Sequence, residues 1–317
     1  MTPQEAILLL RRTVNLGNTL EAPREGDWGF VIQPGHFDVI RQAGFGAVRI
    51  PIRWSAHASQ SEPFTIEPGF LSRIDEVVGW AMERGLAVIL DVHHYEEMAA
   101  NPGGHGPRLL ALWQQIASHF AAAPATLFFE LLNEPNGACD TKTWSQLVAA
   151  LVPLIRLSNP TRPLILGAGN WYSLEQLPLL VLPDDPALIA TFHYYQPFQF
   201  THQGAEWMAG SNAWLGTTWT GTEAECRAVR AAFDEVAAWS QQRNVPVLLG
   251  EFGAYSKAPQ PSRVAWTGYI RQQAELRGFG WAYWEFAAGF GLYDLAAGRW
   301  REDLLGALLA DPAAPHG

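Results

Sequence analysis

Eight short apolar segments recur along the 317-residue chain, and this repetition constrains the fold more than any other feature of the sequence. They cover residues 13–16, 47–50, 87–92, 127–132, 164–166, 188–192, 247–249 and 280–284. Between them lie amphipathic segments with apolar residues at helical spacing, such as 70–85, 109–122, 143–158 and 225–244. Eight strand–helix repeats with nearly continuous apolar strands predict a parallel sheet closed into a barrel, a single (β/α)8 TIM barrel of the α/β class.

A doubly wound open sheet is the structural alternative. It normally has fewer strands and a glycine-rich phosphate loop, but neither a GxGxxG nor a Walker pattern follows any of the eight segments. Hydrophobic residues make up 48% of the chain, which is enough for one large core. Because the sequence shows no linker, low-complexity tract or internal repeat, we expect a single domain over residues 1–317.

The charge of the chain excludes several classes of partner. Charged residues are 16% of the sequence, below the ~25% of average soluble proteins, and the formal net charge is −10. An acidic chain without basic runs repels phosphate, so we expect neither nucleic acid nor an anionic membrane as a partner. Fourteen tryptophans and eight tyrosines instead suit an uncharged substrate.

The two cysteines, Cys139 and Cys226, lie far apart and have no metal-like spacing. This excludes a zinc ribbon or a disulfide scaffold and leaves open whether the two form a single disulfide. The first residues, MTPQEAILLLRRT, lack the basic start, long apolar core and cleavage site of a signal peptide. Because no apolar run reaches the length of a membrane span, we expect a soluble chain.

Polar and aromatic residues follow the apolar segments at their carboxyl ends. In a (β/α)8 barrel these ends meet on one face, where the chemistry of such barrels lies. Single residues there have simple structural explanations, such as a buried Glu134 paired with Arg49, a core histidine at His193 or core packing by Trp284. Polar residues follow the carboxyl ends of strands throughout the chain, and this coincidence argues against explaining each residue separately. The residues concerned are Asn18, Glu21, Arg49, Asp91, His93, His94, Asn133, Glu134, Asn170, Trp171, His193, Tyr195, Glu251, Trp284 and Glu285.

Two of these residues, Glu134 and Glu251, follow the fourth and seventh strands and can face each other across the barrel. Carboxyl groups about 5–5.5 Å apart suit hydrolysis of a glycosidic bond with retention, one as nucleophile and the other as acid and base. We expect Glu251 to be ionised, because Arg49 and a hydrogen bond from Tyr195 favour its charged form. We expect Glu134 to start protonated, with a pKa raised by apolar walls and by its negative partner.

The residues beside Glu134 give two further expectations. The residue before a proline avoids helical geometry, so Pro135 is predicted to keep Glu134 extended, with its side chain held in one direction. The amide of Asn133 is then placed to bind a sugar 2-hydroxyl, a contact that strengthens as positive charge builds at the anomeric carbon.

Alternation along the strands predicts which neighbours face the site. Glu285 follows Trp284 directly and is therefore expected to point away from the site, toward the helices. The same alternation separates His93 from His94, although a bulge at the strand end would admit both.

Taken together, these residues resemble glycoside hydrolase family 5, the retaining cellulase family. Matches run in order from the first strand to the eighth and cover nearly the whole chain. They are Arg49 in VRIPIRW, His93 in ILDVHHY, Asn133 and Glu134 in LLNEP, His193 and Tyr195 in FHYYQPF, Glu251 in LGEFG and Trp284 in WAYWEF. The segments VNLGNTLEAPREGDWG, RIPIRWSAHA, DVHHYEE, FHYYQPFQFTHQGAEW and WAYWEFAAGFGLYD are similar to bacterial endoglucanases of this family that also cleave mannan.

The resemblance implies roles for individual residues. Glu134 would be the acid/base and Glu251 the nucleophile. The cleavage site would be lined by His93, His94, Asn133, His193, Tyr195 and Trp284, and neighbouring sugars would contact Asn18, Glu21, Trp171, His202 and Trp207. No cofactor and no metal are implied, and the expected partner is a β-1,4-linked polysaccharide or oligosaccharide bound by a monomer.

Substrate and location follow from the same resemblance. Cellulose-type β-glucan is the first expectation, glucomannan or mannan the second and xyloglucan the third. An enzyme that meets polymer is expected to be secreted or periplasmic, and a cytoplasmic role on imported oligosaccharides stays open because the sequence shows no leader.

Two functions of other classes remain as alternatives. The first is a metal-dependent hydrolase that uses His93, His94 and His193 with Asp91 or a glutamate, since imidazole and carboxylate form catalytic zinc sites. Neither an HxH pair on the first strand nor a lysine on the fourth supports it. The second is a non-catalytic carbohydrate-binding barrel, which predicts that one of the two carboxylates is lost, although both are present.

Overall fold

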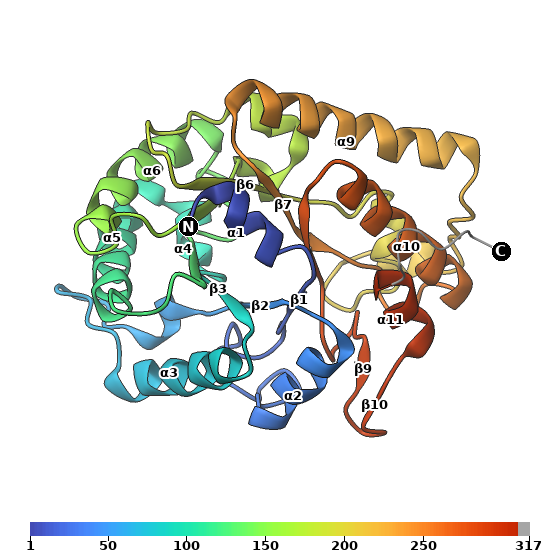
Figure 1. Cartoon of the computed structure of the whole chain (residues 1–317), viewed down its shortest axis with the longest axis horizontal. Helices are drawn as coiled ribbons and strands as arrows, with labels where there is room; N and C mark the ends of the chain where they lie inside the picture. The colour runs from blue at the N-terminus through green and yellow to red at the C-terminus, as the bar shows by residue number, and fades with distance from the viewer. Residues whose placement is uncertain (310–317) are drawn as a thin grey trace.

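The computed structural model describes residues 1–309, and at its centre is a closed barrel of eight parallel strands (Figure 1). Each strand pairs with the next along the chain, and β8 pairs with β1 to close the ring. The strands are β1 (Thr13–Asn15), β2 (Ala47–Ile50), β3 (Ala87–Asp91), β4 (Leu127–Glu130), β5 (Leu164–Gly167), β6 (Leu188–His193), β7 (Val247–Phe252) and β8 (Gly280–Tyr283). Each predicted apolar segment is a barrel strand, and the predicted TIM barrel is confirmed.

Long helices surround the barrel (Figure 1). They are α2 (Pro34–Ala43), α3 (Pro68–Glu83), α5 (Pro102–His119), α6 (Thr141–Arg156), α9 (Glu223–Arg243), α10 (Gln260–Leu276) and α11 (Glu302–Leu309). Among residues 1–309, no helix combines the length and apolar character needed to cross a membrane.

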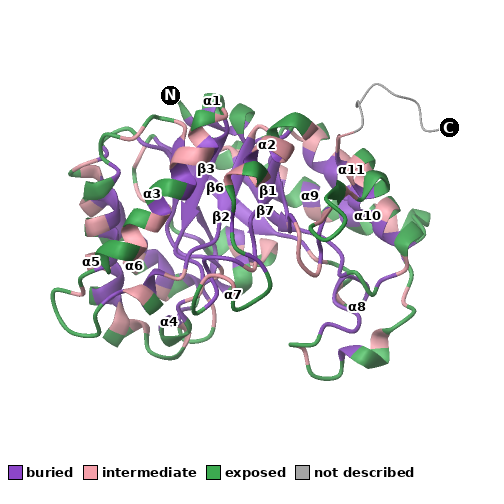
Figure 2. Cartoon of the chain, turned by 90° about the horizontal axis from the view of Figure 1, so that it is seen from below, coloured by how far each residue is buried: buried purple, intermediate pink, exposed green. Residues whose placement is uncertain are grey.

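Short elements lie at the two ends of the barrel. Figure 2 shows α1 (Pro3–Leu9) at one end and α4 (Glu96–Ala100), α7 (Gly169–Tyr172) and α8 (Phe198–Thr201) toward the other. The loops also contain the 3-10 helices η1 (Trp54–His57), η2 (Leu174–Leu179) and η3 (Ser211–Trp214), and a small hairpin of β9 (Tyr293–Asp294) and β10 (Arg299–Trp300).

Every residue of the eight barrel strands is buried, which explains why the sequence shows unbroken apolar runs. Val48 and Leu90 belong to the large core that joins the sheet to its helices. Ile89 and Phe128 belong to a second, smaller cluster, to which α1 contributes Ile7. Because α1 joins this cluster, the barrel is closed at its amino-terminal end and open only where the strands finish.

Two boundaries differ from the sequence prediction for identifiable reasons. Helix α5 begins at Pro102 rather than at 109, because the side-chain oxygen of Asn101 accepts a backbone N–H at 3.0 Å and proline fits the first turn. Strand β7 runs to Phe252 rather than 249, past a register shift against β8 that begins at Leu249. Such irregularities are common next to active sites, and this one lies where the chain carries Glu251.

The two cysteines do not pair. Cys139 is buried, Cys226 is half-buried, and both are free thiols. Burial raises the pKa of the Cys139 thiol to about 11, so it stays protonated and unreactive near neutral pH.

Candidate active site

The carboxyl ends of the strands surround a cleft with a volume of about 1210 Å³. All but one of the residues to which the family resemblance gave a match or a role line it. They are Asn18, Glu21, His93, His94, Asn133, Glu134, Trp171, His193, Tyr195, His202, Trp207, Glu251 and Trp284. The exception is Arg49, which is fully buried beneath the cleft.

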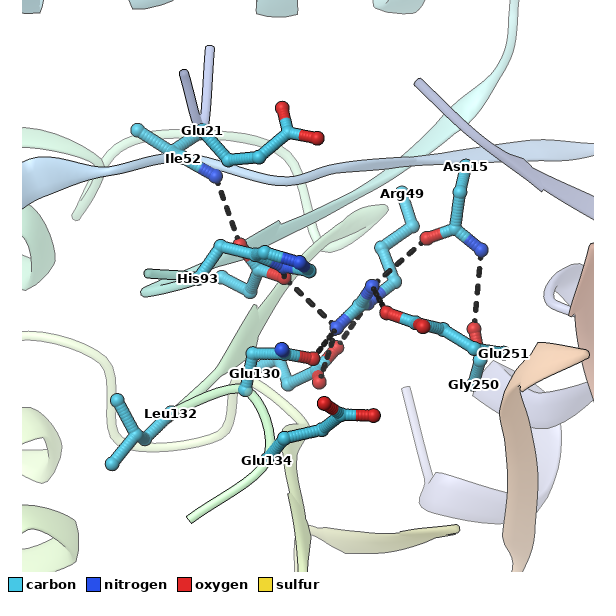
Figure 3. Close-up of polar contacts among 12 residues, drawn as sticks. Asn15, Glu21, Arg49, Ile52, His93, Glu130, Leu132, Glu134, Gly250 and Glu251 are labelled. Atoms are coloured by element: carbon cyan, nitrogen blue, oxygen red, sulfur yellow. Dashed lines mark hydrogen bonds and ion pairs between the residues drawn. The ribbon is translucent and has the colours of Figure 1, made fainter. Parts of the chain in front are cut away.

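Arg49, on β2, is the centre of the charge network under the cleft (Figure 3). Its Nε and Nη2 donate to the two carboxylate oxygens of Glu130 at 2.7 and 2.8 Å. Its Nη1 donates to Oε1 of Glu251 at 2.8 Å. The structural explanation in which Arg49 pairs with Glu134 is therefore wrong, because the arginine bonds to Glu130 and Glu251 instead.

The remaining donors of Arg49 reach Asn15, Asn133 and Asp91. Nη1 donates to Oδ1 of Asn15 at 2.9 Å, and Nη2 lies 2.8 Å from Oδ1 of Asn133 and 2.9 Å from Oδ2 of Asp91. Because the side-chain oxygen of Asn133 is held by the arginine, its NH₂ group is left as the donor at the cleft. This geometry is what the predicted contact with a sugar hydroxyl requires.

Removing the Arg49 charge is expected to destabilise the fold strongly. The substitution Arg49→Met leaves buried carboxylates without their counter-charge, which costs about 3–5 kcal/mol of unfolding free energy. Urea denaturation measures the loss. Arg53→Met is the matched control, because Arg53 pairs with the exposed Glu96 at 2.7 Å and such a pair contributes about 0.2–1 kcal/mol. Equal losses in the two variants would contradict the role given to Arg49.

Asp91 links this network to His93. Its Oδ1 accepts the backbone N–H of Ile52 at 3.0 Å, and its Oδ2 lies 2.7 Å from Nδ1 of His93. Burial raises the pKa of Asp91 to about 6 against the opposing charge of Arg49, and burial lowers the pKa of His93 well below its usual value. A neutral His93 then donates its Nδ1 proton to Asp91, and its Nε2 is left as an acceptor.

Glu251 is held from both sides. Oε1 accepts from Arg49, and Oε2 accepts from the Tyr195 hydroxyl at 2.9 Å, as the sequence predicted. Burial raises the pKa of Glu251 to about 7, and His193 and Arg49 oppose that rise. Glu134 has no such bond to Arg49. Of the two carboxyl groups, Glu251 therefore has the surroundings that favour negative charge more.

Glu134 has the higher pKa of the two carboxyl groups. Burial raises its pKa to about 8, and Arg49 only partly offsets this. Oε1 of Glu134 lies 2.6 Å from Nδ1 of His193, whose own pKa burial lowers to about 4. A protonated carboxyl group beside a neutral imidazole is a pair poised to transfer one proton.

The backbone of Glu134 differs from the sequence prediction. Its φ is 48°, in the left-handed region, so the prediction that Pro135 keeps it extended is wrong. Strand β4 ends at Glu130, and the chain then turns sharply. Two hydrogen bonds hold the turn, from Asn136 Nδ2 to the Glu134 carbonyl at 2.8 Å and from the Trp171 N–H to the Pro135 carbonyl at 3.2 Å. Strained conformations of this kind gather at functional sites.

The two acidic groups are close together. Carboxylate oxygens of Glu134 and Glu251 and a ring nitrogen of His193 all lie within 4.8 Å of one another. Their atom types could hold a metal ion, and within residues 1–309 this group includes neither His93 nor His94. The metal site considered from the sequence, built on three histidines, is therefore not formed. Since Arg49 bonds to Glu251 and His193 bonds to Glu134, the arrangement suits proton transfer.

Glu21 is a third buried acid at the cleft. Its carboxylate accepts the backbone N–H groups of Asn18 and, at 2.8 Å, of Thr19. Burial raises its pKa to about 8 in spite of these bonds, so it is protonated near neutral pH. A protonated Glu21 offers the cleft a donor as well as an acceptor.

Aromatic rings form the walls of the cleft. Trp284 stacks on His93 with centroids 5.5 Å apart and an interplanar angle of 7°. Its indole packs so closely on Gly17 that a Cβ there would lie 2.8 Å from the ring, which explains the glycine. Both His93 and His94 line the cleft, since β3 ends at Asp91 and strand alternation no longer applies beyond it.

Trp171 and Trp207 stand at the rim, with 55% and 61% of their surfaces exposed. Trp171 lies in a run of left-handed residues from Asn170 to Tyr172, with φ between 56° and 58°. Trp207 packs its ring edge-to-face with Tyr255 at 5.0 Å, and His202 lies beside it at 6.5 Å. Exposed flat rings on restrained backbone are suited to stacking with a ligand.

Several residues of the site were missed from the sequence. Glu285, which was predicted to point away from the site, does not line the cleft, and its role as a cap was not foreseen: its buried carboxylate accepts the N–H groups of Ala287, Ala288 and Phe290 in the loop after β8. Phe290 thereby reaches the cleft. Trp28, Asn136 and Phe290 also line the cleft, and Asn15 and Glu130 support it from below.

The profile of the family described as Cellulase (glycosyl hydrolase family 5) matches residues 20–289. The chain belongs to this family. The resemblance seen in the sequence is thus confirmed. Among curated relatives, Endoglucanase H of Acetivibrio thermocellus is 38% identical over 283 residues, which are 89% of this chain and 30% of that relative. Cellulase/esterase CelE of the same organism is 28% identical over 292 residues, 86% of this chain and 35% of the relative. The chain spans about a third of the length of these two proteins.

A solved family 5 structure matches over its full length. Cel5A of Thermotoga maritima in complex with cellobiose is 45% identical, with a TM-score of 0.95, and the match covers 97% of this chain and 100% of that one. The same protein in complex with mannotriose gives the same identity, TM-score and coverage. That protein has therefore been seen with both a glucose and a mannose oligosaccharide.

Proposed function

We propose that this family 5 chain is a retaining endo-β-1,4-glucanase that hydrolyses β-1,4-glucan by a two-glutamate double displacement. The observation that carries the proposal is the short distance between the carboxyl groups of Glu134 and Glu251, with oxygens within 4.8 Å. An inverting enzyme needs about 6.5–9.5 Å to place a water between its acids. The endoglucanase names of the relatives support the same activity.

In the first step Glu251 attacks the anomeric carbon while Glu134 gives its proton to the leaving oxygen. The glycosidic bond breaks, and an ester between the sugar and Glu251 forms. In the second step Glu134, now ionised, takes a proton from water as the water attacks the same carbon. The ester bond breaks, Glu251 recovers its charge, and Glu134 is again protonated. No cofactor takes part in either step.

The surroundings of the two glutamates match these roles. Arg49 and Tyr195 hold both oxygens of Glu251 and fix the direction from which it attacks. His193 contacts Glu134 at 2.6 Å, so the proton stays in place before transfer. Asn133 presents its NH₂ group beside Glu134, where a bond to the sugar 2-hydroxyl strengthens in the transition state.

The cleft favours internal cleavage of a chain. It is open at the rim, where Trp171 and Trp207 offer exposed rings on which sugars beyond the cleavage site can stack. We propose cellulose-type or mixed-linkage β-glucan as the first substrate. Glucomannan or mannan comes second, because Cel5A of Thermotoga maritima binds mannotriose, and xyloglucan third. We further propose that the chain acts as a monomer in a secreted or periplasmic setting.

Product stereochemistry and a substrate panel test the proposal together. Reducing-sugar release is measured on carboxymethylcellulose, barley β-glucan, galactomannan, xyloglucan and xylan, before and after exhaustive chelation. We expect the highest rates on the two glucans, no effect of chelation, and β-anomeric products at early times by proton NMR. Products of α configuration, or activity lost on chelation, would overturn the two-glutamate mechanism.

A further inference from the structure

Two buried side-chain atoms of β6 have no hydrogen-bond partner among residues 1–309. They are Nε2 of His193, the imidazole that contacts Glu134, and Oγ1 of Thr191. His193 is 7% exposed and Thr191 is fully buried, so water does not reach either atom freely. A buried polar atom left unpaired is costly, and buried polar groups are paired in the great majority of cases. Two such atoms on one strand of the site therefore need an explanation.

The two atoms face the same point inside the barrel. Thr191 and His193 are two residues apart in β6, so their side chains point to the same side of the strand. On that side both lie against Gly250, which is skipped where the pairing of β6 with β7 shifts register. A Cβ at position 250 would lie 2.6 Å from Oγ1 of Thr191 and 3.0 Å from Nε2 of His193. The glycine therefore lets the hydroxyl and the imidazole converge.

The groups beside Nδ1 of His193 decide which ring nitrogen carries the proton. Oε1 of Glu134 lies 2.6 Å from Nδ1, and Oε2 of Glu251 lies 3.6 Å from it. Negative charge on Glu251 favours a proton on this nitrogen and opposes a lone pair there. Burial lowers the pKa of His193 to about 4, so the ring carries only one proton near neutral pH. The titratable and charged groups around the ring are Glu134, Glu251, Arg49, Glu130, Asp91 and Tyr172.

A proton on Nδ1 leaves Nε2 as an acceptor, and the donor that faces it is the hydroxyl of Thr191. The tautomer in turn decides which oxygen of Glu134 holds the acid's proton. When Nδ1–H donates to Oε1, the proton of Glu134 lies on Oε2, which can face the leaving group. When the proton of the ring is on Nε2, Nδ1 accepts the Glu134 proton from Oε1 and holds it away from the substrate. A general acid requires the first arrangement.

We propose that Thr191 is a positioning residue for the acid/base: its hydroxyl donates to Nε2 of His193 and keeps the ring proton on Nδ1, so that the proton of Glu134 stays on the oxygen that serves the leaving group. The inference rests on the proposed function and deepens it. Thr191 does not line the cleft, so it acts only through the imidazole. No proton leaves His193 in either step.

Thr191→Val removes the hydroxyl and keeps the shape of the side chain. We expect kcat/KM on barley β-glucan to fall roughly five- to tenfold, the effect of one buried hydrogen bond, through kcat rather than KM. We also expect the alkaline limb of the pH profile to move to higher pH. Nδ1–H stabilises the ionised form of Glu134, whereas a bare Nδ1 stabilises the protonated form, so losing the first tautomer raises the pKa of the acid.

Two further variants and a second substrate separate this role from a loss of packing. Thr191→Ser keeps a hydroxyl and is expected to restore both the rate and the alkaline limb. Thr13→Val is the matched control, because Thr13 is also fully buried in a barrel strand but lies at the amino-terminal end of β1; it is expected to change neither. The burst of dinitrophenolate from 2,4-dinitrophenyl cellobioside needs no acid, so Thr191→Val is expected to leave its rate unchanged.

Nitrogen-15 NMR of the histidine rings reads the tautomer directly. The ring signals of His193, assigned by their loss in His193→Asn, are expected to show the proton on Nδ1 in the unmodified protein. In Thr191→Val the share of the Nε2–H form is expected to rise. A proton found on Nε2 in the unmodified protein, or ring signals unchanged in Thr191→Val, would overturn the proposal. If the unmodified protein hydrolyses no β-glucan, the proposed function fails, and the NMR still decides on the hydrogen bond from Thr191.

Discussion

Replacing Glu251 with glycine is expected to lower β-glucan hydrolysis by on the order of 10⁴-fold, because the nucleophile that forms the glycosyl-enzyme is gone. The substitution removes a side chain that Arg49 and Tyr195 hold at 2.8 and 2.9 Å, and it leaves a small cavity next to the anomeric carbon. Initial rates on barley β-glucan measure the loss. The proton on Glu134 and the binding surfaces of the cleft remain.

Azide provides a specific rescue of this variant. The anion fits the space vacated by the carboxylate and can attack the anomeric carbon of an aryl cellobioside, while the phenolate leaves. One displacement instead of two gives a glycosyl azide of α configuration, which NMR identifies. Glu251→Gln is the control, because its amide fills the cavity and azide is not expected to rescue it. Substantial hydrolysis by the glycine variant without azide would rule out Glu251 as the nucleophile.

The barrel, and the convergence of the site residues at one end of it, could be predicted from the sequence for one physical reason. Strands buried on both faces appear as apolar runs, and parallel connections bring all their carboxyl ends to one face. Residues such as His93 and Glu251, which lie just past the end of an apolar run, therefore line the same cleft even though they are far apart in sequence. The hydrogen bonds from Arg49 and Tyr195 to Glu251 were expected for the same reason, because all three residues lie in, or just past the end of, strands whose carboxyl ends lie together.

Other features depend on geometry that the apolar pattern does not encode. Glu130 lies inside an apolar run between Phe129 and Leu131, and only the closed barrel shows that it pairs with Arg49. The left-handed turn at Glu134 depends on hydrogen bonds from Asn136 and Trp171, of which the second comes from a different strand–helix unit. The preference of a residue before proline for extended backbone takes no account of such hydrogen bonds, so it could not predict the left-handed conformation of Glu134.

Trp28 was missed for a different reason. It lies in a loop well after the end of β1, so its position relative to a strand end gave no signal. A usable signal was present in the sequence EGDWGF, where two glycines flank an aromatic residue closely enough to form a turn. Exposed aromatic residues in such turns warrant inspection whenever an uncharged polymer is the expected ligand.

Replacing Glu134 with alanine is expected to reduce hydrolysis of β-glucan by on the order of 10³-fold, because the leaving sugar oxygen is no longer protonated. The loss should depend on the leaving group. In a 2,4-dinitrophenyl cellobioside the leaving group is dinitrophenolate, which departs without being protonated. The glycosyl-enzyme therefore still forms at a nearly normal rate, and a burst of dinitrophenolate precedes slow turnover. Stopped-flow absorbance measures the burst, and the ratio of losses on the two substrates tests the role of the acid.

The pH dependence gives an independent test of the same residue. Burial raises the pKa of Glu134 to about 8, so its acid form is present below that pH and is lost as the pH rises through it. The alkaline limb of kcat/KM in the unmodified protein is therefore expected near pH 8, and it should disappear in Glu134→Ala. The acidic limb, which reflects ionisation of Glu251, is expected to remain, because Arg49 still holds that carboxylate. An alkaline limb unchanged in the variant would assign the proton to another group and contradict the division of roles between the two glutamates.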